Sequence, residues 1–356
     1  MSLPKTMKAA VLFGEGDMRL VNDYPVPEPG PGEVVIKVAA CAICGTDPKI
    51  LAHGWPNHPP YGEFIFGHEY AGTIAALGEG VTEFKIGDRV AVEPHKGCGV
   101  CANCRDGLYN TCLNYGNIKK GHRHYGFSFN GGYAEYACNH INSVYKIPDD
   151  MPIDVSTLIT TAATSLYGIR RIGGIQAGET VVVSGPGPIG LLSVVMARLL
   201  GAGTLILTGT RAERLDMGKQ LGADIGVNIR EENVVERIMA LTKGVGADAV
   251  LECAGTTQAA VDAVEYAKKN GRVALVGIYK EPAPLNVNKI VQWNINVAGS
   301  KAEGERSMAQ ALSLLSRGAI DISPLVTHTF PLDQIHAAFE TAEQRLEGAV
   351  KVVVKP

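Results

Sequence analysis

The stretch Gly185-Pro186-Gly187-Pro188-Ile189-Gly190 decides the fold of this chain. It matches the spacing G-x-G-x-x-G, follows three valines at residues 181–183 and opens an apolar stretch, residues 188–200, that is typical of a helix. In this context the first glycine permits a tight turn, the second lets the backbone approach a pyrophosphate, and the third brings the helix close to the sheet. The helix N-terminus then offers N–H groups to the anion. We therefore predict a dinucleotide site formed by Gly185, Gly187, Pro188, Ile189 and Gly190; a turn that serves only packing is the alternative.

Strands and helices alternate outward from this turn. We expect strands at residues 180–184, 204–208, 249–253 and 273–277, and helices at residues 188–200, 211–221 and 257–269. This alternation predicts an α/β fold with a doubly wound parallel sheet over residues 156–297.

The rest of the chain has a different character. Residues 1–155 hold short β-like runs, such as residues 8–13, 34–40 and 89–92, separated by glycine and proline. Such runs suggest a barrel-like β lobe. A helix-like stretch at residues 307–316 and a strand at 349–354 follow the α/β part, so residues 298–356 form a third segment.

Composition excludes several classes of protein. The 33 Lys and Arg against 36 Asp and Glu give a net charge of −3, without the basic excess that binds nucleic acid or an anionic membrane. The longest helical apolar stretch, residues 189–200, is too short to span a bilayer. No apolar stretch of signal-peptide length follows the N-terminus, so we expect a cytoplasmic protein in which cysteines stay reduced.

The end of the second strand of the α/β part indicates the cofactor. An NAD enzyme places Asp or Glu there, about 20 residues after the glycines, to bind the ribose 2′-hydroxyl. This chain instead has Gly209, Thr210 and Arg211, with Arg214 one helical turn further on. Glycine leaves room, threonine offers a hydroxyl, and a guanidinium suits a phosphate. We predict NADP rather than NAD; an arginine that merely begins an exposed helix is the alternative.

Four cysteines lie close together at Cys98, Cys101, Cys104 and Cys112. Four thiolates at short spacing can close a tetrahedral zinc site with no open position, which describes structural zinc. An iron–sulfur cluster is disfavoured because its usual run ends C-x3-C-P, whereas the last gap here is seven residues and Leu113 follows. Cys41, Cys138 and Cys253 are expected to be ordinary buried thiols.

A second metal site is more dispersed. Cys44-Gly45-Thr46-Asp47 and Gly67-His68-Glu69 supply a thiol, an imidazole and a carboxylate, all competent zinc ligands. Three protein ligands and a water would leave the open position that catalysis needs. A lone histidine or cysteine is more often structural, so only the combination indicates a site.

These motifs together resemble the zinc-dependent medium-chain alcohol and polyol dehydrogenases, in the same order and along essentially the whole chain. The resemblance implies a GroES-like β-barrel catalytic domain (1–155 and 298–356), a doubly wound Rossmann domain (156–297), and hydride transfer between NADP(H) and a secondary alcohol or polyol. It implies one catalytic and one structural zinc per chain, and a homodimer or homotetramer. It implies a proton-transfer role for Thr46 and positions near the nicotinamide for Ala254, Gly277 and Ile278.

The chain departs from that family in two places. The family usually has Cys or Glu just before the Rossmann domain, but this chain has Thr160-Thr161-Ala162-Ala163. We therefore expect Cys44, His68 and Glu69 as the zinc ligands, an arrangement that resembles sorbitol dehydrogenases; an indirect role for Glu69 is the alternative. Lys49 stands where many members have a histidine of the proton relay, so the route of the proton stays open.

Several alternatives remain at this stage. A zinc-free enone or quinone reductase of the same superfamily is disfavoured by Cys44, His68 and the four cysteines, and a non-catalytic NADPH-binding protein is the third possibility. Trp55, His53 and the segments 125–127 and 131–133 are candidates for lining a substrate cleft; support of a β-turn explains the last two equally well. The substrate, beyond a small alcohol or ketone, and the physiological direction stay undetermined.

Overall fold

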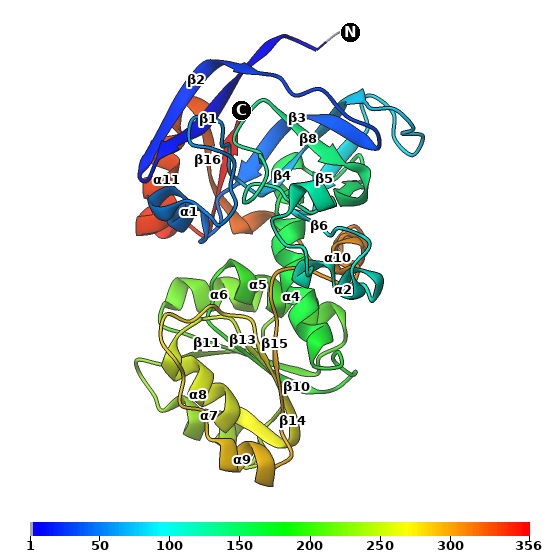
Figure 1. Ribbon diagram of the computed structural model, residues 1–356. Coiled ribbons are helices and arrows are strands. Elements are labelled where there is room, and N and C mark those ends of the chain that lie inside the picture. The colour runs from blue at the N-terminus through cyan, green and yellow to red at the C-terminus, as the bar shows by residue number, and fades with distance from the viewer. Residues whose placement is uncertain (1–2) are drawn as a thin grey trace. The chain divides into compact units, whose positions relative to one another are not determined.

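The computed structural model describes residues 3–356, which divide into two compact units (Figure 1). The first unit takes the chain up to Thr160 and the segments Gly304–Ala309 and Ile322–Pro356, and the second takes Thr161–Glu303 and Gln310–Asp321. Each unit is described separately below.

The first unit is built on a seven-stranded sheet in the order β16-β17-β3-β4-β5-β9, with β8 also paired to β3. All its pairings are antiparallel except that of β16 with β17. Two-stranded sheets β1-β2 and β6-β7 complete its β structure. The strands are β1 (Thr6–Gly14), β2 (Asp17–Pro25), β3 (Glu33–Ala42), β4 (Glu69–Leu77), β5 (Arg89–Val92), β6 (His95–Lys96), β7 (Arg123–His124), β8 (Tyr136–His140), β9 (Val144–Lys146), β16 (Val326–Pro331) and β17 (Lys351–Lys355).

Short helices join these strands: α1 (Asp47–His53), α2 (Ala102–Arg105), α3 (Ile153–Ser156) and α11 (Ile335–Gln344). The core is made of apolar residues from β1, β3, β4 and α11, including Ile36, Ile74 and Phe339, and of Phe66 in the loop before β4. The C-terminal strand β17 contributes Val352 and Val354 to this core, so the end of the chain completes the N-terminal lobe.

The second unit contains a six-stranded sheet in the order β12-β11-β10-β13-β14-β15, and every pairing in it is parallel. Numbered along the chain this order is 3-2-1-4-5-6, the doubly wound arrangement. The α/β fold class predicted from the sequence is confirmed. The strands are β10 (Thr180–Ser184), β11 (Thr204–Gly209), β12 (Ile225–Asn228), β13 (Ala247–Glu252), β14 (Ala267–Leu275) and β15 (Asn296–Gly299).

The helices of the second unit follow the strands closely. They are α5 (Pro188–Leu199), α6 (Ala212–Gln220), α7 (Val234–Leu241), α8 (Thr257–Tyr266) and α9 (Val287–Gln292), while α4 (Leu158–Arg171) and α10 (Ser307–Leu315) contain the boundaries between the units. The expected helix over residues 257–269 is wrong at its end. The helix stops at Tyr266 because the next residues join β14, where Lys268 pairs with Asp248 of β13.

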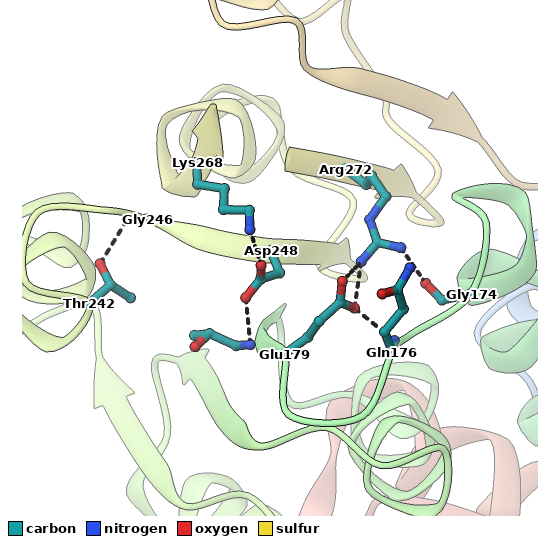
Figure 2. A network of polar contacts seen from close by, with 9 residues as sticks. Gly174, Gln176, Glu179, Thr242, Gly246, Asp248, Lys268 and Arg272 are labelled. Atoms are coloured by element: carbon teal, nitrogen blue, oxygen red, sulfur yellow. Dashed lines mark hydrogen bonds and ion pairs between the residues drawn. The ribbon is translucent and has the colours of Figure 1, made fainter. Parts of the chain in front are cut away.

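A polar network that includes Glu179, Asp248, Lys268 and Arg272 lies at the amino-terminal ends of β10 and β13 (Figure 2). Arg272 donates from Nη2 to both carboxylate oxygens of Glu179 at 2.5 Å, just before β10 begins. Asp248 accepts the backbone N–H of Thr180 at 2.8 Å and forms an ion pair with Lys268. These contacts tie β10, β13 and β14 together away from the carboxyl ends of β10 and β13, where doubly wound sheets bind ligands.

Candidate functional site

Cys44 lies in the turn between β3 and α1. Asp47, the first residue of α1, is fully buried and accepts the backbone N–H of Cys44 at 2.8 Å and the hydroxyl of Tyr133 at 2.9 Å through Oδ2. Thr46 places its Oγ1 3.8 Å from the Cys44 sulfur. The turn is therefore held by a buried carboxylate, and Lys49, on the same helix, is exposed.

His68 lies in the loop before β4, next to Gly67. Gly67 has φ +89°, and a Cβ there would stand 2.7 Å from the Tyr133 ring, so only glycine fits. His68 is buried, with its Nδ1 3.3 Å from Asp47 Oδ1. Burial lowers the pKa of His68, but the negative charges of Asp47 and Cys44 outweigh it and raise the pKa well above its ordinary value. Asp47 thus orients the imidazole, as carboxylates do behind metal-binding histidines.

Glu69, the first residue of β4, is buried and forms an ion pair with Lys351 of β17. Lys351 is itself buried; burial lowers its pKa, but the adjacent Glu69 and Cys44 charges raise it above its ordinary value. The two residues are 282 positions apart, and no sequence signal pointed to Lys351. The lysine balances the charge of a carboxylate that would be costly alone.

Cys44, His68 and Glu69 come together, with their potential ligand atoms all within 4.8 Å of one another. A thiol, an imidazole and a carboxylate are a donor set suited to zinc, and this geometry fits such an ion. The Thr160 hydroxyl donates to the carbonyl of Val92 at 3.0 Å, so it is engaged within the unit.

Cys98, Cys101, Cys104 and Cys112 form the second cluster, again with sulfur atoms within 4.8 Å of one another. The sulfurs of Cys98 and Cys104, and those of Cys101 and Cys112, are 3.9 Å apart. Four sulfurs at Zn–S distances of about 2.3 Å in a tetrahedron lie about 3.8 Å apart, so the fit to zinc is close. We call residues 97–117 the cysteine lobe.

Hydrogen bonds to sulfur support this cluster. Asn114 donates its side-chain amide to Cys98 Sγ at 3.2 Å, and the backbone N–H of Cys101 points to the same sulfur at 3.4 Å. Burial raises the pKa of Cys98, but these donors outweigh it and lower the pKa to about 6. The thiolate form, which binds metals, is therefore favoured at Cys98.

Cys41, Cys138 and Cys253 lie outside both clusters, and all eight cysteines are free thiols. Cys41 is buried as expected, but Cys138 and Cys253 are only half-buried, so that expectation is wrong for these two. Burial raises the pKa of both to about 12, which disfavours the thiolate form.

The glycine-rich turn joins β10 to α5 as the spacing predicted. Gly185 has φ +93°, Gly187 is the N-cap of α5, and Pro188 is its first residue. A Cβ on Gly190 would stand 1.8 Å from the carbonyl oxygen of Gly185, so the third glycine is required for close packing. Ile189 is half-buried in the first turn of the helix.

Gly209 ends β11 against this turn. A Cβ at Gly209 would stand 2.4 Å from Cδ of Pro186, which explains why no acidic residue is found there. Thr210 and Arg211 follow half-buried, with Arg211 as the N-cap of α6. Arg214 is buried and donates to the carbonyl of Pro186 at 3.3 Å, so it supports the glycine-rich turn directly.

The other two segments predicted near a cofactor meet at Glu252, which the sequence analysis missed. Glu252 is buried at the end of β13 and accepts the backbone N–H groups of Ala254 at 2.7 Å and Gly255 at 3.0 Å, together with the hydroxyl of Tyr279. Gly277 approaches so closely that a Cβ there would be 2.4 Å from Gly255 Cα, and Ile278 is exposed. An acid directly after three apolar strand residues, 249–251, was the available signal.

A Cys-His-Glu cluster, a four-cysteine cluster and a doubly wound parallel sheet are together the features of a zinc-binding dehydrogenase. The alcohol dehydrogenase GroES-like domain matches residues 30–149, and the zinc-binding dehydrogenase domain matches residues 188–317. The chain belongs to the zinc-binding alcohol and polyol dehydrogenase family, and the resemblance found from the sequence is confirmed.

The match to named relatives extends over nearly the whole chain. Sorbitol dehydrogenase of Bacillus subtilis is 34% identical over 357 residues, covering 100% of this chain and 99% of the relative. L-threonine 3-dehydrogenase of Pyrococcus abyssi is 33% identical over 337 residues, 94% of each. The solved structure of a candidate zinc-binding dehydrogenase of Sinorhizobium meliloti, bound to NADP, is 32% identical with a TM-score of 0.90 and covers 99% of this chain and 100% of its own. Among residues 3–356, no helix has the length and apolarity to cross a membrane.

Proposed function

We propose that the protein is a zinc-dependent oxidoreductase that transfers a hydride reversibly between NADP(H) and a secondary alcohol or polyol and its ketone. One observation carries this proposal: Cys44, His68 and Glu69 bring three different zinc-competent donors within 4.8 Å of one another. The family membership and the names of the relatives, which include sorbitol and threonine dehydrogenases, support it.

Cys44, His68 and Glu69 would hold the catalytic zinc. Bound zinc would lower the pKa of the substrate hydroxyl, as it lowers that of water. The four cysteines of the lobe would hold a second, structural zinc with no open position. The place of Glu69 in the cluster supports its role as a direct zinc ligand. The same carboxylate also forms an ion pair with Lys351, so it would have two partners.

The chain's own residues orient the reaction and carry its proton. Asp47 fixes the imidazole of His68 and the backbone of Cys44. Thr46, beside the Cys44 sulfur, would accept the proton of the substrate hydroxyl and pass it outward. Exposed Lys49 stands three residues further on, so solvent is available to receive the proton.

The nicotinamide of the cofactor supplies the hydride chemistry. Gly185, Gly187, Pro188, Ile189 and Gly190 would hold its pyrophosphate at the start of α5. Ala254, Gly277 and Ile278 would lie near the nicotinamide. NADP preference is supported by Gly209, Thr210 and Arg211, none of which brings a carboxylate that would repel a 2′-phosphate, and by the NADP bound in the Sinorhizobium meliloti relative.

Steady-state kinetics test this function. Polyols, sugars, threonine and simple secondary alcohols should be screened with NADP and with NAD, alongside zinc analysis. We expect about two zinc per chain and a higher kcat/KM with NADP. A higher kcat/KM with NAD would overturn the cofactor assignment; turnover of an enone or quinone without metal would favour the zinc-free reductase.

Arg211→Ala sharpens the cofactor assignment. Removing a charged hydrogen bond to phosphate should lower kcat/KM for NADP about 10- to 100-fold and leave kcat/KM for NAD within about twofold. Arg230→Ala, a change at an exposed arginine, is the matched control. Equal losses with both cofactors would show that Arg211 serves the fold of α6 and not the phosphate.

We also propose a homodimer or homotetramer acting in the cytoplasm, as family membership implies. Size-exclusion chromatography with light scattering measures the assembly, and a monomer at micromolar concentration would contradict this part of the proposal.

A further inference from the structure

A cluster of aromatic rings extends from His68 within the first unit. The ring of Phe127 lies 4.4 Å from that of His68, centroid to centroid, and is buried. His124 stacks on Phe127 at 3.8 Å with 16° between the planes. Trp55 meets Phe127 edge to face at 4.9 Å. One ring, Phe127, thus contacts a proposed zinc ligand and two other side chains at once.

Tyr115 joins the two outer members of this cluster. The Trp55 indole donates from Nε1 to the Tyr115 hydroxyl oxygen at 3.2 Å, and the same hydroxyl bonds to Nδ1 of His124. Because an indole can only donate, the tyrosine oxygen accepts from it and its own hydrogen is available to His124. A single hydroxyl therefore sets the positions of both rings against Phe127.

Tyr115 is part of the cysteine lobe. It follows Cys112 by three residues, and its backbone N–H donates to the carbonyl of Cys112 at 3.1 Å. The preceding residue, Asn114, donates through its side chain to the sulfur of Cys98. The position of Tyr115 is therefore set by the geometry of the four-cysteine cluster.

A second contact joins the lobe to the loop that carries Trp55. Gly116 has φ +72°, and a Cβ there would stand 2.5 Å from the side-chain nitrogen of Asn57 and 3.0 Å from its Cβ. The backbone N–H of Gly116 donates to Nδ1 of His122 at 3.1 Å. Trp55 follows Gly54, which is the C-cap of α1, and α1 is the helix that begins beside Cys44. The lobe thus packs on a loop that is one short helix away from the proposed catalytic metal.

We propose that the cysteine lobe determines substrate affinity: Tyr115 is a positioning residue that holds Trp55 and His124 against Phe127 and so shapes the wall of the site beside His68. The inference rests on the proposed function of that site. Ligand sites are lined mainly by aromatic and apolar side chains with a few placed polar groups, and this cluster has that composition. Trp55 is half-buried, which leaves part of its ring for a substrate to contact.

Tyr115→Phe in the zinc-loaded enzyme tests the proposal, because it removes only the hydroxyl. We expect KM for the alcohol to rise about three- to tenfold, the range of one lost hydrogen bond, with kcat within about twofold. Tyr109→Phe is the matched control: this tyrosine lies in the same lobe, but its hydroxyl bonds to Glu93. It should lower the thermal midpoint without changing KM.

Fluorescence gives a readout that does not depend on turnover. The chain has two tryptophans, so Trp293→Phe leaves Trp55 as the only indole. In that background, Tyr115→Phe should shift the emission of Trp55 and increase its quenching by acrylamide, whereas Tyr109→Phe should change neither.

The two readouts separate the possible failures. An unchanged KM, or an unchanged Trp55 emission, in Tyr115→Phe overturns the proposal. An equal rise in KM in Tyr109→Phe also overturns it, because the lobe would then act only through stability. If the wild type oxidises no alcohol at all, the proposed function fails; the emission shift then still decides whether Tyr115 holds Trp55.

Discussion

The two candidate metal-binding clusters of the first unit are assembled in opposite ways. Cys98, Cys101, Cys104 and Cys112 lie within one short lobe, and their sulfurs are held by backbone N–H groups and an amide from the same lobe. The Cys44, His68 and Glu69 cluster takes support from remote positions instead, with Tyr133 behind Asp47 and Lys351 behind Glu69. The four-cysteine cluster can therefore form from one short segment, whereas the Cys44, His68 and Glu69 cluster needs contacts from distant parts of the unit.

Cys44→Ser gives the largest expected effect and isolates the remote cluster. Loss of the thiolate should remove the proposed catalytic metal, so alcohol oxidation should fall at least about 10³-fold, which corresponds to about 4 kcal/mol. NADP binding, measured by titration, should stay unchanged. Cys138→Ser, at a half-buried cysteine outside both clusters, is the control and should keep its activity. Retained turnover in Cys44→Ser would exclude the zinc mechanism.

Lys351→Met tests the remote support. It removes the ammonium of the buried Glu69–Lys351 ion pair, which in the metal-free protein should lower the free energy of unfolding by about 3 kcal/mol. The double variant Lys351→Met/Glu69→Gln should recover most of that stability, as chemical denaturation can measure for the complete cycle. If the losses of unfolding free energy in the two single variants simply added in the double variant, the ion pair between Lys351 and Glu69 would not contribute to stability.

Cys101→Ser tests the local cluster. Zinc content should fall to about one per chain, and the thermal midpoint should drop by roughly 5–10 °C for a loss of about 2–3 kcal/mol. Turnover should stay measurable, in contrast to Cys44→Ser. If Cys101→Ser abolished activity as completely as Cys44→Ser, the two clusters would not be separate in function.

Asn114→Ala has the smallest expected effect. It removes one hydrogen bond to Cys98 Sγ, so the affinity of the lobe for zinc should fall about tenfold and stability by about 1 kcal/mol. Competition with a chelator measures the affinity. Asn103→Ala is the matched control, since that amide donates to the carbonyl of Thr111 at 2.7 Å and not to sulfur. A similar loss of zinc affinity in both variants would mean that the conformation of the lobe backbone, and not the hydrogen bond to sulfur, sets the affinity.

The same contrast explains what could be predicted from the sequence. The residues of the four-cysteine cluster and of the glycine-rich turn lie close together in the sequence. Both motifs could therefore be recognised from residue spacing alone. The strand at residues 180–184 was predicted to the residue for the same reason, since its valines are buried in a continuous run. Gly209 was assigned to the end of the second strand of the doubly wound sheet, where it lies.

What could not be predicted depends on tertiary contacts. In the sequence, Lys351 is a single lysine in a C-terminal strand and belongs to no motif. Only the pairing of β17 with β3 brings it to Glu69. Tyr115 similarly carries no motif, and its role follows from its contacts with Trp55 and His124. The end of α8 was missed because Lys268 has good helix propensity, yet its ion pair with Asp248 places it in β14.

The packing of Gly209 on Pro186 has a consequence for how cofactor preference can change. An aspartate at position 209 would put its Cβ 2.4 Å from the proline ring, so a single substitution toward an NAD-type acid would distort the glycine-rich turn before it met any ribose. The proline must be replaced first, or together with the glycine. The two positions therefore form an epistatic pair, and the order of substitutions limits both laboratory redesign and natural divergence at this site.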